Sequence, residues 1–111
     1  MVAGELTVDC DVREDGHTVF VDGELDLATA PELVTAVTQL LGQRALSITV
    51  DLDGVTFIDS AGVRGIQIVR DLCRKHGCVL AITPGQRQVQ RVFEVAGINQ
   101  VLPFRDSSRG T

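Results

Sequence analysis

The strongest constraint on the fold is a change in the spacing of apolar residues near the middle of the chain. From Leu46 to Leu52, apolar and polar residues alternate strictly, which is the period of a strand with one buried face. From Ser60 to about Lys75 the apolar residues recur at helical spacing. A parallel strand covered by helices on both faces is usually apolar throughout. The polar face of this strand therefore predicts a sheet whose helices lie mainly on one side.

Shorter alternating runs predict the other strands. Residues 5–11 and 17–25 are separated by a Glu-Asp-Gly turn signal, and together they predict an antiparallel hairpin. Residues 78–83 and 101–104 predict two further strands, each preceded by a helical segment and therefore parallel to its neighbour. The chain is thus expected to be α/β, with a mixed sheet of about five strands in which only the N-terminal hairpin is antiparallel.

Two more helices are predicted from their capping signals. One runs from Thr29 to about Leu41, where Thr29 and Glu32 have the spacing of a capping box. The other begins at Pro84, a residue favoured in the first helical turn, and ends at Gly97. Both carry an apolar stripe, so both are expected to pack on the sheet.

The length of 111 residues is that of one domain. We expect the domain to occupy residues 1–104, with a flexible C-terminal tail over residues 105–111. No apolar run approaches the roughly 18 residues that span a bilayer. The N-terminus also lacks the basic and apolar regions of a signal peptide. A cytoplasmic protein with no membrane association is therefore expected.

The charge is unevenly distributed and argues against nucleic acid as a partner. The net charge is −5, and residues 1–26 hold eight acids and one arginine. Direct nucleic-acid binding needs clustered cations, so it is not expected. Asp51, Asp53 and Asp59 gather near predicted strand ends, and they are interpreted as solvated loop residues rather than as metal ligands.

The three cysteines do not form a metal-binding or disulfide pattern. Cys10, Cys73 and Cys78 contain no C-x-x-C pair, and the chain has only two histidines. We interpret the three cysteines mainly as small thiols in a reducing compartment. The alternative is that Cys73 and Cys78 form a redox pair. Neither a metal nor a cofactor is expected.

Ser60 lies where a buried segment ends and a helix begins, so it is expected to be accessible and close to outward-pointing N–H groups. A hydrolase elbow requires Gly-x-Ser-x-Gly, but Ile58 replaces the first glycine, and neither His17 nor His76 can reach Ser60 as a base. The patterns of phosphate-binding loops are also absent. The residues leave two interpretations open: a plain helix cap at Asp59 or Ser60, and a serine that another enzyme phosphorylates.

Three blocks of the sequence resemble the STAS domain of bacterial anti-sigma factor antagonists. They are Gly23-Glu24-Leu25-Asp26, residues 50–63 with Asp-Ser-Ala-Gly at 59–62, and residues 84–98 with a Val-Phe-Glu-x-Ala-Gly-Ile ending. In order and spacing they cover nearly the whole chain. The resemblance implies a binding protein rather than an enzyme. One departure is Ala61, where relatives often carry Ser or Thr, and it leaves Ser60 as the only hydroxyl in the motif.

The resemblance also implies a mechanism. In that family the unphosphorylated antagonist binds an anti-sigma factor that is also a GHKL-type serine kinase, and the sigma factor is released. The kinase then phosphorylates the motif serine, the antagonist dissociates, and a serine phosphatase resets it. By motif position, phosphorylation is assigned to Ser60. The residues expected to contact the partner are Asp26, Asp59, Ser60, Ala61, Gly62 and Val63.

Val63 is included because it falls on the polar side of the predicted helix, beside Ser60. Two alternative functions are kept. One is a redox-gated interaction module that uses Cys73 and Cys78. The other is a STAS module that acts without phosphorylation in another signalling assembly.

Overall fold

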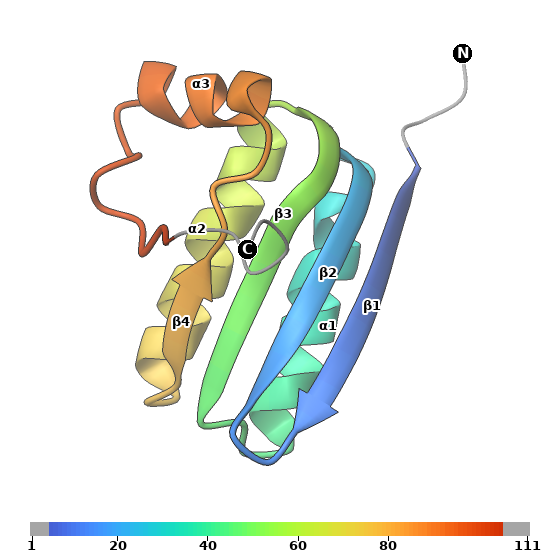
Figure 1. The fold of residues 1–111 in the computed structure, drawn as a ribbon, viewed down its shortest axis with the longest axis vertical. Coiled ribbons are helices and arrows are strands. Elements are labelled where there is room, and N and C mark those ends of the chain that lie inside the picture. Colours follow the sequence, from blue (N-terminus) through green and yellow to red (C-terminus); the bar gives the residue numbers. More distant parts are fainter. Residues whose placement is uncertain (1–4, 106–111) are drawn as a thin grey trace.

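A mixed sheet forms the centre of the computed structural model, which describes residues 5–105 (Figure 1). The strands lie side by side in the order in which they occur in the chain: β1 (Leu6–Arg13), β2 (Gly16–Leu25), β3 (Ser47–Ile58) and β4 (Val79–Ile82). β1 and β2 are antiparallel, whereas β3 is parallel to both β2 and β4. The α/β class and the antiparallel N-terminal hairpin are confirmed.

The sheet has four strands in the described part of the chain, so the expectation of about five is wrong. Residues 101–104 contribute only an isolated parallel bridge between Ile82 and Phe104. Pro103 accepts a hydrogen bond from the Ile82 N–H at 3.0 Å, but as a proline it has no N–H with which to extend a ladder. The Arg105 N–H donates to the Ile82 carbonyl at 2.9 Å, and the rest of the predicted tail lies outside the described residues.

The three helices of residues 5–105 are α1 (Ala30–Gly42), α2 (Ser60–Lys75) and α3 (Arg87–Val95). α1 and α2 pack side by side against one face of the sheet, as expected, and α3 lies across its end (Figure 1). α3 begins three residues later than Pro84 because Gly85 has a φ of +74°, which is outside the helical region. None of these helices is long and apolar enough to cross a bilayer.

The alternating residues of β3 form the centre of the core. Ile48, Val50 and Leu52 are at most 1% exposed and face the two helices. Leu46 was expected to share that face, but it precedes the strand and is 80% exposed. The strand begins at Ser47, and at position 46 only the backbone carbonyl bonds to the sheet, accepting from the Val79 N–H at 3.0 Å. The alternation of the sequence therefore extends one residue beyond the strand.

β3 continues six residues past the predicted end at Leu52 and reaches Ile58. Its pairing with β2 has two register shifts, near Asp22 and Gly23, and Gly54 lies beside the first of them. A Cβ atom at Gly54 would overlap the Asp22 side chain, so a larger residue there would have to displace that carboxylate. As a result, Leu25 and Ile58 end their strands together, directly before the start of α2.

Asp51 is fully buried, so its interpretation as a solvated loop residue is wrong. It alternates with the core residues and therefore lies on the sheet face opposite the helices, where its carboxylate accepts a hydrogen bond from the Asp53 N–H at 2.9 Å. The buried Thr83 hydroxyl donates to Asp53 Oδ1 at 3.1 Å and accepts from the Leu52 N–H at 2.8 Å. These contacts fix the loop after β4 to β3. No three His, Cys, Asp or Glu side chains within residues 5–105 lie close enough to hold a metal ion.

Candidate functional site

Ser60 is the exposed first residue of α2, and Asp59 is its N-cap. Asp59 has extended backbone angles, and its side chain accepts a hydrogen bond from the Gly62 N–H at 2.9 Å. The sequence left the cap open between Asp59 and Ser60, and the structure assigns it to Asp59. No hydrogen bond found within residues 5–105 involves the Ser60 hydroxyl, which is therefore not needed to begin the helix.

Gly62 fixes the first turn of α2 against the end of β2. A Cβ atom at this position would overlap the Leu25 carbonyl and approach Ile58 Cγ1 to 2.7 Å. The Asp59 N–H also donates to the Leu25 carbonyl at 3.3 Å. Gly62 was predicted to contact a partner, but it is buried. Its place in the motif is explained by packing, since only glycine allows the helix to start this close to the strand.

Asp26 organises the turn between β2 and α1. One of its carboxylate oxygens accepts hydrogen bonds from the N–H groups of Ala28 and Thr29, at 3.0 and 3.1 Å. The Thr29 hydroxyl accepts from the Asp26 N–H at 2.9 Å and donates to the Glu24 carbonyl at 2.7 Å. Thr29 therefore makes no side-chain cap on α1, and the predicted capping box is wrong. Asp26 is only half-buried, so its carboxylate is also accessible to a partner.

Val63 is only 6% exposed and belongs to the main hydrophobic core, so the prediction that its side chain is exposed is wrong, whereas its contact with a partner stays a prediction. The prediction used only the helical spacing of the residues around Val63. α2 also packs against α1 and α3, and these elements widen the face that is buried. Of the residues in the first turn, Ser60 is exposed, Asp59 and Ala61 are half-buried, and Gly62 and Val63 are buried.

An apolar groove with a volume of about 340 Å³ lies between α1 and α2. Ala61, the residue after Ser60, is among its lining residues. Gly65 allows the helices to approach, since a Cβ atom at this position would lie 3.1 Å from Ala30 Cβ. Leu27 and Ile68 line the groove and are 79% and 37% exposed. Neither was predicted from the sequence as a site residue. The sequence held one signal that could have identified this groove. Leu27 is an apolar residue in a polar turn, and it belongs to no apolar stripe of a helix or strand.

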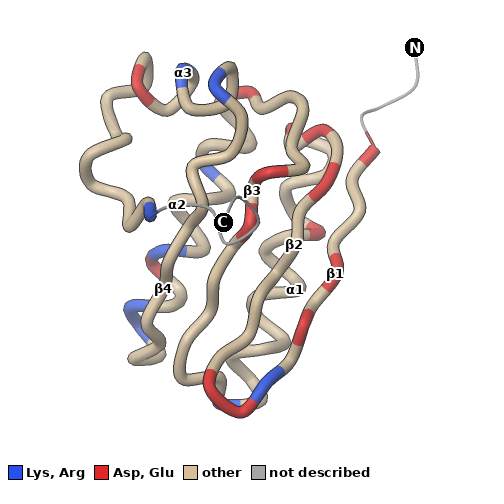
Figure 2. Tube along the Cα trace, in the orientation of Figure 1, with Lys and Arg blue, Asp and Glu red and all other residues tan. Residues whose placement is uncertain are grey.

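Charge around this end of the molecule is mainly negative. Figure 2 shows Asp and Glu residues along β1 and around the ends of β2 and β3, while Lys and Arg residues lie mainly on α2 and α3. Glu24 is exposed at the end of β2, close in sequence to Asp26 and Leu27. The surface formed by Asp26, Leu27, Asp59, Ser60, Ala61 and Ile68, here called the docking surface, therefore combines an apolar groove with acidic neighbours.

Cys73 and Cys78 lie together at the other end of α2, in a Schellman motif. The Cys78 N–H donates to the Cys73 carbonyl at 2.9 Å, and the N–H of Gly77, which has a φ of +68°, donates to the Arg74 carbonyl at 3.2 Å. Burial raises the pKa of the Cys73 thiol to about 12, and it also raises the pKa of Cys78. Both thiols are therefore protonated at neutral pH. Cys73 lies thirteen residues from Ser60, or roughly 20 Å along the helix.

The comparisons with known proteins agree on one family. The STAS domain model matches residues 8–110. A curated relative, the anti-sigma-B factor antagonist of Staphylococcus aureus, is 26% identical over 103 residues, which cover 93% of this chain and 95% of that protein. Among solved structures, an anti-sigma factor antagonist from Mycobacterium paratuberculosis has a TM-score of 0.79 at 20% identity, over 95% of this chain and 89% of that one.

A third relative has been solved in two states. It is the Bacillus protein SpoIIAA, 18% identical in its unphosphorylated form with a TM-score of 0.70, and 19% identical in its phosphorylated form with a TM-score of 0.66. These forms cover 94% of this chain in each case, and 89% and 92% of SpoIIAA. At these identities the structures establish a common fold. Together with the family model, which spans most of the chain, they show that the chain belongs to the STAS domain family.

Proposed function

We propose that this protein is a cytoplasmic anti-sigma factor antagonist that acts by binding and is switched off by phosphorylation of Ser60. Its partner is an anti-sigma factor of the GHKL serine kinase class, and binding releases the sigma factor. A serine phosphatase restores the active form. The proposal is supported by the names of the relatives and by a surface that offers a protein partner an apolar groove beside an accessible serine.

One observation carries the proposal: the Ser60 hydroxyl is exposed and uncommitted at the start of α2, because Asp59 takes the capping role. A kinase can therefore use this hydroxyl without breaking a structural hydrogen bond. The helix dipole favours a phosphate at this position, together with the amides of Ser60 and Ala61, whereas the Gly62 and Val63 amides already donate to Asp59. The modified chain is thus expected to keep its fold.

Partner binding, unlike the fold, is expected to change when Ser60 is phosphorylated. Phosphate adds about −1.5 to −2 charges at neutral pH. These charges would lie beside Asp59 and Asp26 and at the edge of the apolar groove, where an unmodified serine adds no charge. Any partner that buries this edge would then have to remove the phosphate from water, which costs far more than burying a hydroxyl. The expected result is an intact domain with a blocked docking surface.

Phosphorylation by the cognate kinase tests this proposal. Incubation with the anti-sigma factor and ATP should add one phosphate to the wild type and none to Ser60→Ala, as measured by intact-protein mass spectrometry. Thr56→Ala is the matched control, because Thr56 is another exposed hydroxyl residue, four positions earlier. It should be phosphorylated like the wild type. A phosphate that persists in Ser60→Ala, or unchanged partner affinity after phosphorylation, would contradict the proposed switch.

The contact between Cys73 and Cys78 gives specific support to the redox-gated alternative. If that alternative is correct, an oxidant such as a hydroperoxide should lower partner affinity in the wild type but not in Cys73→Ser. We expect no such change, since the buried thiols are protonated and lie far from Ser60. A loss of affinity that requires both cysteines would instead favour redox gating. Binding with no dependence on either Ser60 phosphorylation or oxidation would indicate the phosphorylation-independent STAS module in another signalling assembly.

A further inference from the structure

Arg64 lies one helical turn after Ser60, on the same exposed face of α2. Residues at positions i and i+4 of a helix are neighbours, with about 5–6 Å between their Cβ atoms. Helical side chains generally lean toward the N-terminus, so a side chain at position 64 can extend over the turn that contains Ser60. This places a guanidinium within reach of a group attached to the serine hydroxyl.

The Arg64 guanidinium is available for such a contact. Within residues 5–105 the two ion pairs join Arg13 to Asp11 and Arg70 to Asp71, and neither involves Arg64. The closest acid in sequence, Asp59, already accepts the Gly62 N–H as the helix cap. In the unphosphorylated protein, Arg64 therefore takes part in neither ion pair of residues 5–105.

A phosphate on Ser60 would supply the missing partner. It has three strong acceptor oxygens, and the planar fork of an arginine binds two of them at once. The Gly62 and Val63 amides already donate to Asp59, so the helix dipole and the amides of Ser60 and Ala61 would act on the same group. Arginine and helix terminus would thus hold the phosphate from two directions, although acidic residues lie close by.

We infer that Arg64 is the positioning residue that binds the phosphate of phosphorylated Ser60 and holds it against its own helix. This inference rests on the proposed function, since it requires Ser60 to be modified. Its consequence is that the switched-off form is stabilised from within the domain. A phosphate held in this way is also less accessible to a phosphatase than one that projects into water.

The test uses the full chain with phosphoserine incorporated at position 60 during synthesis, so it does not depend on any kinase. The second pKa of phosphoserine is near 6, and a neighbouring cation lowers it. Titration followed by phosphorus NMR should give a value roughly half a unit higher in Arg64→Gln than in the wild-type background. Removal of the phosphate by a general protein phosphatase should be several-fold faster in Arg64→Gln, and Arg64→Lys should lie between the two.

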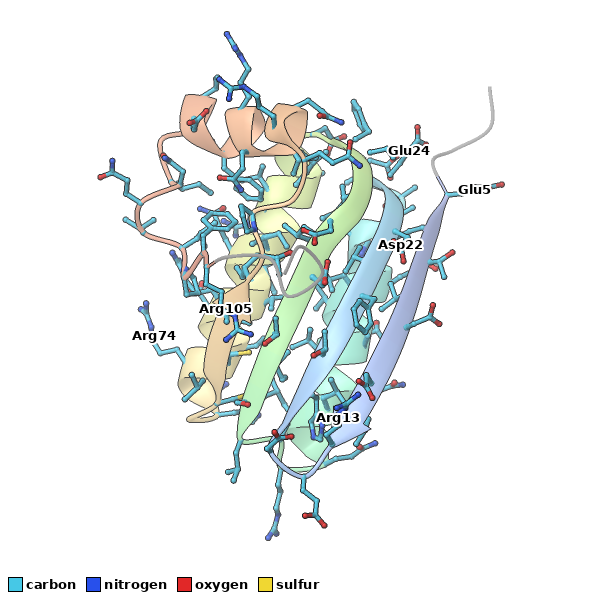
Figure 3. All side chains as sticks on the ribbon, viewed as in Figure 1. Glu5, Arg13, Asp22, Glu24, Arg74 and Arg105 are labelled. Atoms are coloured by element: carbon cyan, nitrogen blue, oxygen red, sulfur yellow. The ribbon has the colours of Figure 1, made fainter. Side chains whose placement is uncertain are left out.

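Arg74→Gln is the matched control, because it removes the same charge from an exposed position at the far end of α2, away from Glu24 and the end of β2 (Figure 3). It should leave both measurements at their wild-type values. Equal phosphate pKa values and equal dephosphorylation rates in wild type and Arg64→Gln would overturn the inference. That result would leave the proposed function standing, whereas a kinase that ignores Ser60 would contradict the proposed function without affecting this titration.

Discussion

Replacing Gly62 with alanine is expected to lower the free energy of unfolding by about 3 kcal/mol. The added Cβ atom would overlap the Leu25 carbonyl, and a backbone atom at the end of a paired strand cannot rotate away as a side chain can. Since a domain of this size has a total stability of about 5–15 kcal/mol, the change is large. Urea denaturation followed by circular dichroism should show a midpoint lowered by roughly 1–3 M.

Gly42→Ala is the matched control for this experiment. Gly42 is also helical and is exposed, and a Cβ atom there would have no neighbour within 4 Å. Alanine should therefore leave the stability unchanged or raise it by up to about 1 kcal/mol, because it reduces the freedom of the unfolded chain. If both substitutions had the same effect, the close approach of α2 to Leu25 would not be what requires glycine at position 62.

Replacing Leu27 with aspartate is expected to weaken binding of the anti-sigma factor by about 30- to 100-fold, equivalent to about 2–3 kcal/mol. Leu27 is 79% exposed and lines the groove, so a partner that fills the groove must cover it. A charge at this position would have to be buried without an ion partner. Isothermal titration calorimetry with the unphosphorylated protein would measure the change in Kd.

Leu46→Asp provides the control for the Leu27 experiment. Leu46 is 80% exposed and Leu27 is 79% exposed, but Leu46 precedes β3 and is therefore at the opposite end of the sheet. Both variants should fold and unfold like the wild type, because neither leucine is in the core. Equal affinities of the two variants for the anti-sigma factor would show that the groove is not part of the interface.

The sequence predicted the parts of this fold that depend on local patterns. Alternation in residues 46–52 indicated a strand with one polar face, and the structure has its two long helices on a single side of the sheet. The change to helical spacing at Ser60 located the start of α2 correctly. These features follow from periodicity and turn chemistry, which act over a few residues and can be read without knowing the tertiary structure.

The errors occur where distant segments determine the outcome. Val63 is buried because α2 packs on α1 and α3 as well as on the sheet, and a helical wheel does not contain those neighbours. Thr29 has the spacing of a helix cap, but it bonds to Asp26 and Glu24 instead, because the preceding strand ends beside it. Asp51 is buried although its place near the predicted end of the strand suggested a solvated loop. In each case a tertiary contact competes with a local preference and prevails.

The groove residues were missed for a related reason. Ile68 shares a helical stripe with fully buried residues, yet it remains 37% exposed because it lies at the margin between α1 and α2. Leu27 has no periodic neighbours at all, since it lies in a turn. Such residues can be recognised only when the two helices are seen together, because the groove belongs to neither helix alone.

The assignment of the helix cap to Asp59 has a consequence for genetics. Because Ser60 makes no hydrogen bond that the helix needs, alleles that change this residue should leave the amount of protein in the cell unaltered. A strain carrying Ser60→Ala would then report the loss of regulation alone, without the reduced abundance that usually complicates such phenotypes. An allele of Asp59 would not have this property, since it would alter the cap and the regulated surface in a single step.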